Sequence, residues 1–439
     1  MRIGLCGLAL LAACGGGGGG GDDGPGPDAA TAVTPTQNAA REIAKTEMSF
    51  DVTALSGVEK VTFVDGTVGG TLEVGDLTID SVKLAGADLA FAPRMTTETT
   101  KHVIDLALPT GEQTVEIAYH FKTHASFDGY SSKGFTLVWP YYCGNLFPCH
   151  SEPADGVETT LALTGVPTGK MAIFPPTISE APSYMAAFTI DDYTELPLGT
   201  TTAGTQISAW YRPNGQAAAT AGSAHLVAAF DWYEKNIGPY RFGTKAGSVS
   251  VNWGSSAGLG GMEHHPFWHI GTADFADEET HAHEAAHGWY GDAIRLACWE
   301  DFVLSEGTVS YLAARSLTVV APTVGEAITA SYKNELATSI VGTDPVWPEG
   351  CNQIDVINDN LFTRAPYVRG ALFYQAVADK VGADKVDMAL ETFYTAHAGK
   401  TGSMADMLTT LTQVTGYDVT ACAQIWLRST TVPTYAACN

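Results

Sequence analysis

The sequence has few charged residues and very few basic ones. Charged residues make up 16% of the 439 residues, and 23 Lys and Arg face 48 Asp and Glu, which gives a net charge of −25. Nucleic acid and anionic membrane surfaces would repel such a protein, so this balance excludes them as main partners. No apolar run reaches the roughly 20 residues of a membrane-spanning helix. The hydrophobic content of 45% nevertheless excludes a largely disordered chain and, at this length, provides for two or three domains.

The N-terminus has the pattern of an export signal. Arg2 precedes a short apolar stretch that ends in Leu-Ala-Ala-Cys14, which resembles a bacterial lipobox. The resemblance implies a signal peptide at 1–13 and lipidation of Cys14, while an ordinary signal peptide is the alternative. A Gly-, Pro- and Asp-rich tether follows at 14–40, and Gly15 in place of an aspartate favours the outer membrane. We therefore expect an exported protein, anchored by lipid in a bacterial membrane and facing the periplasm or the cell surface.

Cysteine is scarce, and no two cysteines have the C-x-x-C spacing of many metal or redox motifs. Without Cys6 of the leader and Cys14, six cysteines remain, and an even number in an exported chain predicts disulfide bonds. Six cysteines allow 15 pairings. We predict pairing between nearest neighbours, namely Cys143–Cys149, Cys298–Cys351 and Cys422–Cys438.

The pattern of apolar residues divides the chain into two parts. Alternation of apolar and polar residues predicts strands at 77–84, 102–108 and 114–121, separated by Gly-rich turns. Helical spacing predicts helices at 224–237, 277–291, 305–316, 326–337, 368–381, 385–397 and 403–415, the last with a capping box at Ser403 and Asp406. We expect an all-β domain at 41–205 and a mainly helical domain at 206–439.

The strongest functional signal is His283-Glu284-Ala-Ala-His287. Two histidines four residues apart lie on the same face of a helix, so both can bind one ion. Zinc prefers such nitrogen ligands, and the glutamate between them is suited to deprotonate a water molecule. A zinc site also needs a third protein ligand, and Glu306, separated from His287 by eighteen residues, begins a second predicted helix.

This motif and its spacing resemble the gluzincin metallopeptidases, in particular the aminopeptidase N and leukotriene hydrolase family. The resemblance extends over about residues 48 to 433. It implies an α+β multidomain chain, with an N-terminal all-β, sandwich-like domain and a thermolysin-like, mainly helical zinc peptidase domain. It also implies one Zn²⁺ bound by His283, His287 and Glu306, with Glu284 as the general base.

Further residues match the family in order. Gly260-Gly261-Met262-Glu263-His264 resembles the family's G-x-M-E-N motif, which implies that Glu263 binds the substrate's free ammonium and that the backbone of Gly260 and Gly261 lines the peptide. Met262 and His264, in the same motif, are also expected to contact the substrate. Pro366-Tyr367-Val-Arg-Gly370 resembles the segment of the catalytic tyrosine, so Tyr367 is expected to donate to the oxyanion of the tetrahedral intermediate. Asp301 matches a family aspartate and is expected to orient a ligand histidine.

Several departures from the family pattern leave alternatives open. His264 stands where the family has asparagine, and 134–143 contains neither the glutamine nor the glutamate that the β domain usually supplies. The family's C-terminal helical domain is missing from this sequence, which suggests a more open cleft. We expect a peptidase that releases N-terminal amino acids. The alternatives are a zinc endopeptidase or another hydrolase on the same centre, or an inactive surface-binding lipoprotein. The oligomeric state stays open, with a monomer favoured.

Overall fold

The computed structural model describes residues 33–96, 102–254, 260–340, 344–436 and 438. The predicted signal peptide, Cys14 and most of the predicted tether lie outside these residues, so export and lipid anchoring stay predictions. The last part of the predicted tether is docked on the β-rich part, where the Thr36 amide donates to the carbonyl oxygen of Leu106 at 3.3 Å. Residues 34–40 therefore belong to the folded body, and Thr34–Asn439 form one compact unit.

The first part of this unit is built from β-strands. A seven-stranded sheet has the order β14-β12-β1-β2-β8-β4-β5. Its strands are β1 (Ile43–Asp51), β2 (Ser56–Phe63), β4 (Thr78–Leu84), β5 (Ala87–Asp88), β8 (Gln113–His120), β12 (Val157–Thr164) and β14 (Thr177–Ala181). A three-stranded sheet consists of β3 (Gly70–Glu73), β6 (Phe91–Met95) and β7 (His102–Leu106), and a five-stranded sheet consists of β9 (Thr123–His124), β10 (Gly129–Ser131), β11 (Phe135–Leu137), β13 (Met171–Ile173) and β15 (Thr189–Asp191). The predicted β-rich N-terminal part is confirmed.

Alternation along the strands explains why this part has an apolar core. In β8, Val115, Ile117 and Tyr119 are fully buried, whereas the residues between them are partly or fully exposed. Successive side chains of a strand point to opposite faces, so one face of the sheet is apolar and buries against the rest of the β-rich part.

The second part begins with another five-stranded sheet, of order β16-β17-β18-β20-β19. Its strands are β16 (Thr194–Thr200), β17 (Gln206–Tyr211), β18 (Lys245–Val251), β19 (Gly261–Met262) and β20 (Phe267–Gly271). β16 and β17 pair antiparallel, and the predicted domain boundary at 205 lies in the turn between them. A domain boundary placed before Thr194 keeps all the strands of this sheet in one domain.

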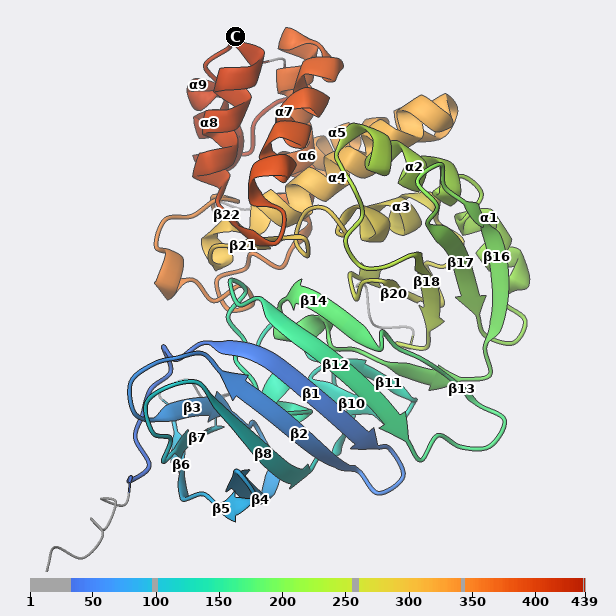
Figure 1. Ribbon diagram of the computed structural model, residues 1–439. Coiled ribbons are helices and arrows are strands. Elements are labelled where there is room, and N and C mark those ends of the chain that lie inside the picture. The colour runs from blue at the N-terminus through green and yellow to red at the C-terminus, as the bar shows by residue number, and fades with distance from the viewer. Residues whose placement is uncertain (1–32, 97–101, 255–259, 341–343, 437, 439) are drawn as a thin grey trace, which may run out of the picture. The chain divides into compact units, whose positions relative to one another are not determined.

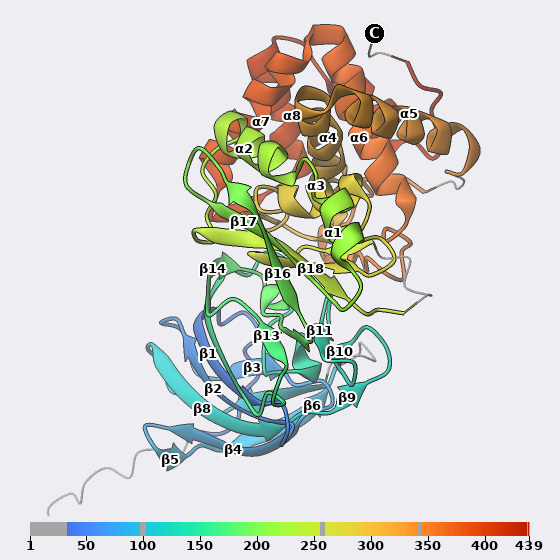
Figure 2. The ribbon, with the colours of Figure 1, turned by 90° about the vertical axis from the view of Figure 1, so that its right-hand side faces the viewer.

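The remaining elements are mainly helical, as predicted. They are α1 (Gln216–Gly222), α2 (Leu226–Asn236), α3 (Glu278–Ala286), α4 (Phe302–Val320), α5 (Pro322–Thr338), α6 (Arg364–Val381), α7 (Ala383–His397), α8 (Met404–Thr415) and α9 (Thr420–Ala423), with β21 (Ile294–Leu296) and β22 (Lys400–Gly402) as a two-stranded sheet. Helices α1 to α3 pack on the β16–β20 sheet. Figures 1 and 2 both show this sheet between the N-terminal strands and helices α4 to α9.

All three predicted disulfide bonds are present: Cys143–Cys149, Cys298–Cys351 and Cys422–Cys438. The bond between Cys298 and Cys351 joins the segment before α4 to the segment before α6. These two helices carry Glu306 and Tyr367, so the cross-link restrains the elements on which the predicted site depends.

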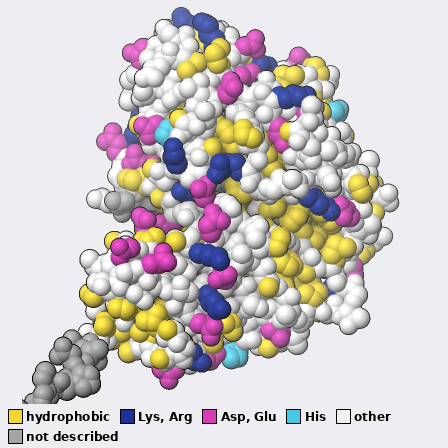
Figure 3. Space-filling view, viewed as in Figure 1, with side chains coloured by type: hydrophobic (Ala, Val, Ile, Leu, Met, Phe, Trp, Pro, Cys, Tyr) yellow, Lys and Arg dark blue, Asp and Glu magenta, His cyan; other side chains and the backbone are white. Residues whose placement is uncertain are grey.

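The surface carries charges of both signs. On the face drawn in Figure 3, Lys and Arg side chains lie among Asp and Glu side chains. Lys170 and Asp192 form an ion pair at the surface, at 2.7 Å, and exposed pairs of this kind contribute at most about 1 kcal/mol each. The stability of the fold therefore depends mainly on its apolar core. Among the described residues, no helix combines the length and the apolar character needed to cross a membrane.

A buried carboxylate lies in the core of the N-terminal part. Glu59 on β2 is fully buried, and neither of its carboxylate oxygens has a hydrogen-bond partner among the described residues. Burial raises the pKa of Glu59 well above its ordinary value. The side chain is therefore protonated in the folded protein at a pH where the unfolded chain has already released that proton.

This difference makes stability depend on pH. Between the unfolded pKa, about 4.3, and the raised folded pKa, the folded state binds one more proton, so stability falls by about 1.4 kcal/mol per pH unit as the pH rises. We expect Glu59→Gln to remove this loss. The free energy of unfolding of the variant, minus that of the natural protein, should therefore increase with pH. Urea unfolding from pH 5 to pH 8 measures the difference. Glu116→Gln, exposed on the neighbouring strand β8, is the control, and a difference that does not change with pH contradicts the prediction.

Candidate metal centre and active site

Three predicted ligands converge at one point. Helix α3 supplies His283 and His287, and α4 supplies Glu306. The two Nε2 atoms are 3.2 Å apart, and Glu306 Oε2 lies 3.1 Å from His283 Nε2 and 3.5 Å from His287 Nε2. Ligand atoms about 2.1 Å from a tetrahedral ion lie about 3.4 Å from one another. The three atoms therefore have the spacing that a tetrahedral zinc ion requires.

The local structure of α3 presents both histidines together. Asp277 caps the helix by accepting from the Thr280 amide at 3.0 Å. The helix ends at Ala286, five residues earlier than the predicted end at 291, yet His287 keeps helical backbone angles (φ −58°, ψ −25°). Its side chain consequently stays one turn above His283 on the same face.

The other ring nitrogen of each ligand histidine faces a polar partner. His283 Nδ1 lies 3.3 Å from Ser310 Oγ, and His287 Nδ1 lies 3.1 Å from the carbonyl oxygen of Tyr290 and 3.3 Å from Ser305 Oγ. Such contacts orient an imidazole and leave Nε2 for a metal. Asp301 does not contribute here, because its Oδ1 accepts from the Met404 amide at 2.8 Å at the start of α8. The expected role of Asp301 is corrected: serine hydroxyls and a backbone carbonyl orient the histidines.

Two glycines bring α4 and α6 into close contact beside the ligands. A Cβ atom on Gly307 would lie 2.7 Å from Gly370 Cα, and one on Gly370 would lie 2.5 Å from Gly307 Cα. No larger side chain fits at either position, so the two helix backbones touch. Gly307 follows Glu306, and Gly370 lies one turn after Tyr367. This contact consequently brings the third ligand and the predicted catalytic tyrosine to the same place.

Tyr367 lies against the ligand histidines, as the resemblance implied. Its ring stacks on the His283 ring with centroids 5.8 Å apart and contacts Phe302 edge-on at 6.1 Å. The side chain lines the same cavity as the three ligands. A phenol held in this way can donate a hydrogen bond to an oxygen atom close to the metal position.

The cavity around the ligands has a volume of about 90 Å³. It is lined by Trp139, Gly260, Gly261, Met262, Glu263, Glu279, Thr280, His283, Glu284, His287, Glu306, Phe362, Arg364 and Tyr367. Gly261 on β19 lies directly against Glu284, since a Cβ atom there would lie 2.2 Å from Glu284 Oε1. Glu284 Oε2 is buried and has no hydrogen-bond partner among the described residues, so it is available to bind a water molecule or a substrate.

Three carboxyl groups, those of Glu263, Glu284 and Glu306, lie close to His287. Burial raises the pKa of Glu284 and of Glu263, the charge of His287 opposes this, and Glu306 adds to it. Burial also opposes ionisation of Glu306, but His287 and the hydrogen bonds from both histidines hold its pKa at about 2. A divalent cation would offset this excess of negative charge. The donor set, its spacing and its charge all fit Zn²⁺.

Glu263 lies in the cavity as predicted, and its neighbour His264 does not. Tyr184 of the β-rich part lies beside Glu263, where the two side chains line one small cavity, and it lowers the pKa of the Glu263 carboxyl group. His264 is 1% exposed, and its Nδ1 lies 3.1 Å from His269 Nδ1, away from the cavity lining. The expectation that His264 contacts substrate is therefore corrected. His265 is also structural, since it contacts the hydroxyl of Tyr240 and the carbonyl oxygen of Glu284.

Five residues of the cavity lining were not predicted from the sequence: Trp139, Glu279, Thr280, Phe362 and Arg364. Trp139 comes from the 134–143 stretch in which a glutamine or glutamate was sought, and its ring lies 4.8 Å from that of Phe362. Arg364 lies three residues before Tyr367, and this helical spacing is the signal that could have identified it. Neither aromatic side chain had a comparable signal, because Trp139 and Phe362 are more than two hundred residues apart.

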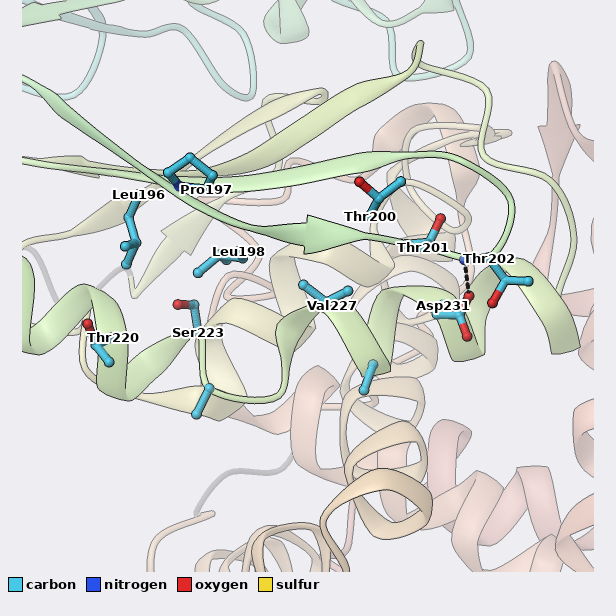
Figure 4. A pocket seen from close by; sticks show the side chains of 12 residues that line it. Leu196, Pro197, Leu198, Thr200, Thr201, Thr202, Thr220, Ser223, Val227 and Asp231 are labelled. Atoms are coloured by element: carbon cyan, nitrogen blue, oxygen red, sulfur yellow. Dashed lines mark hydrogen bonds between the residues drawn. The ribbon is translucent and has the colours of Figure 1, made fainter.

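A larger cavity, of about 520 Å³, lies elsewhere and has different chemistry. It lies between β16 and helices α1 and α2, and Leu196, Leu198 and Val227 point into it among several threonines (Figure 4). Its carboxylate, Asp231, already accepts from the Thr202 amide at 2.6 Å and pairs with Lys235. The described lining contains no histidine or cysteine, so the cavity lacks the ligands of a zinc site.

Comparisons with known proteins found similarities of sequence and of fold. The family described as "Peptidase family M1 domain" matches residues 274–426. Leucine aminopeptidase 2 of Aspergillus niger is 28% identical over 184 residues, which are 37% of this chain and 28% of that protein. Aminopeptidase N of Streptomyces lividans is 22% identical over 156 residues, which are 34% of this chain and 18% of that protein. The matched region is thus less than a third of either relative's length.

Similarity of fold covers more of the chain. The crystal structure of the M1 zinc metallopeptidase from Deinococcus radiodurans has a TM-score of 0.73 and 18% identity, covering 90% of this chain and 95% of that one. The fold and the donor set define an H-E-x-x-H protein whose third candidate ligand is a glutamate from the next helix. Residues 274–426, which contain the three candidate ligands, match the model of this peptidase family.

Proposed function

We propose that this protein is a zinc-dependent metallopeptidase that releases N-terminal amino acids from peptides. The observation that carries the proposal is the tetrahedral spacing of His283, His287 and Glu306, with Glu284 and Glu263 in the same cavity. The two relatives described above support it, since both are named aminopeptidases. A variant of the Deinococcus enzyme was crystallised with a Tyr-Ser-Ala substrate, which supports a peptide ligand for this fold.

Each side chain has a task in this reaction. Bound by the three ligands, zinc supplies Lewis-acid polarisation of the scissile carbonyl and lowers the pKa of water. Glu284 accepts the proton of the attacking water and passes one to the leaving amine. Tyr367 donates its phenolic hydrogen to the oxygen that becomes negative as the carbonyl carbon turns tetrahedral. The backbone of β19 at Gly261 is suited to pair with an extended substrate.

Glu263 decides between an exopeptidase and an endopeptidase. Its buried carboxylate, which lies beside Tyr184, can bind the free ammonium of a peptide, whereas an internal peptide bond brings no charge to this position. An endopeptidase is the second candidate, because the residue that the β-rich part contributes to the described lining is the uncharged Trp139. Glu263 therefore lacks the second polar anchor that the family usually has.

Hydrolysis of a panel of aminoacyl-coumarins, with and without a zinc chelator, tests the proposal. We expect hydrolysis that the chelator abolishes and zinc restores, and no release of coumarin from N-acetylated aminoacyl substrates. Glu263→Gln is expected to raise KM for free-amine substrates by about 10- to 100-fold, because hydrogen bonds to charged groups contribute about 1.5–3 kcal/mol. Cleavage of N-acetylated peptides at internal bonds would instead support the endopeptidase, and absence of any chelator-sensitive hydrolysis would overturn both.

A further inference from the structure

The cavity contains a basic side chain that the proposed reaction does not use. Arg364, the first residue of α6, is the only Lys or Arg in the described cavity lining. Its Nε and Nη2 donate to the Glu335 carboxylate at 3.0 and 3.1 Å, and its side chain is 52% exposed. We find no acceptor for its Nη1 amino group among the described residues. Arg364 therefore has hydrogen-bond donors available at the mouth of the cavity.

Arg364 lies close to the groups that act on the scissile bond. Its guanidinium carbon is 5.7 Å from the centre of the Tyr367 ring and 5.9 Å from that of Tyr332. Tyr332 in turn donates to Glu279, another residue of the cavity wall, at 2.6 Å. Because one residue of an extended chain spans about 3.3 Å, a group one or two residues beyond the scissile carbonyl can reach Arg364.

The cavity lining offers an acidic group and a basic group at different places. Glu263 offers a carboxylate for a substrate ammonium, and Arg364 offers a guanidinium whose only ion-pair partner among the described residues is Glu335. Since Glu335 accepts from the Nε and Nη2 atoms of the guanidinium, a second carboxylate can still bind to Nη1. A short peptide carries both charges, an ammonium at one end and a carboxylate at the other.

We propose that Arg364 binds a substrate carboxylate one or two residues beyond the scissile bond, so that the preferred substrates are di- and tripeptides with a free C-terminus. This inference rests on the proposed function, since it assumes that peptide is cleaved at this centre. The same carboxylate chemistry could come from an acidic side chain at these positions, and the test separates the two sources.

The test compares tripeptides that differ only at the C-terminal group. The first residue is the one best released from the coumarin panel, followed by Ser-Ala with either a free carboxylate or an amide. We expect kcat/KM to be about tenfold higher for the acid, as for a half-exposed, charge-assisted hydrogen bond. Arg364→Gln should lower kcat/KM for the acid about tenfold and for the amide less than twofold, and Arg364→Lys should retain part of the preference. Lys380→Gln, which removes an exposed charge from the other end of α6, should keep the full preference for the acid over the amide.

A binding measurement separates this inference from the proposed function. Calorimetric titration of the zinc-loaded Glu284→Gln protein with the same two tripeptides gives their Kd ratio without turnover. If no peptide is hydrolysed, the proposed function fails, while the Kd ratio still tests Arg364. Equal Kd values for acid and amide, or a ratio unchanged by Arg364→Gln, overturn the inference. Stronger binding of amidated peptides with Asp than with Asn at the second position would assign Arg364 to an acidic side chain and overturn the C-terminal assignment.

Discussion

Replacing Glu284 by Gln is expected to reduce kcat by about 10²- to 10⁴-fold, the usual contribution of a positioned general base. Gln keeps the size of the side chain against Gly261 but cannot accept the proton of the attacking water. KM should change little, because the groups that bind the peptide remain. Steady-state hydrolysis of the best coumarin substrate measures the effect.

The control for this variant lies on the same helix. Glu278→Gln changes a carboxylate in the first turn of α3, which pairs with His225 and is not part of the described cavity lining. We expect its kcat to stay within about twofold of the natural protein, as for surface substitutions away from the site. A Glu284→Gln protein with more than a tenth of the natural kcat would show that another group acts as the base.

Replacing His287 by Ala is expected to abolish zinc-dependent hydrolysis. A tetrahedral site that loses one of its three protein ligands loses both affinity and geometry, so we expect a fall in kcat of at least about 10³-fold. Zinc at a thousandfold excess over its Kd stabilises the natural protein by about 4 kcal/mol, and the variant should lose most of this gain. Thermal unfolding with and without zinc, together with metal analysis of the purified proteins, measures both effects.

His225→Ala serves as the matched control for the ligand variant. His225 lies close to α3, where it contacts Glu278 at 2.5 Å, but it lies outside the described cavity lining. The control should retain one zinc per chain and the full thermal shift. If the His287→Ala protein binds zinc as tightly as the natural protein, the proposed centre is wrong.

Local patterns predicted the elements and the ligands because the relevant contacts span only a few residues. The spacing of His283 and His287 placed both on one helix face, and Ser403 caps α8 by accepting from the Asp406 amide at 3.2 Å. The strands predicted at 77–84, 102–108 and 114–121 match β4, β7 and β8 within two residues at each end. The helix predicted at 277–291 ends at Ala286, and Gly291, which has a positive φ of 106°, turns the chain before β21.

The errors concern residues whose roles depend on distant partners. Asp301 lies close to the ligands in sequence, yet its carboxylate accepts from Met404, more than a hundred residues later. His264 belongs to the motif that begins at the cavity strand β19, but its ring contacts His269 and does not line the cavity. Sequence position gave no information on either contact.

The sequence alone determined the metal chemistry, because helical periodicity and ligand preference are local properties of His283, Glu284 and His287 and because Glu306 follows at a characteristic distance. The tertiary structure decided which other side chains surround that centre. Trp139 reaches it from the β-rich part, and Gly307 and Gly370 allow α4 and α6 to approach so closely that Tyr367 stacks on His283. Arg364 reaches the mouth of the cavity through the same contact. These arrangements depend on packing between segments far apart in the chain, and no periodicity within one segment encodes them.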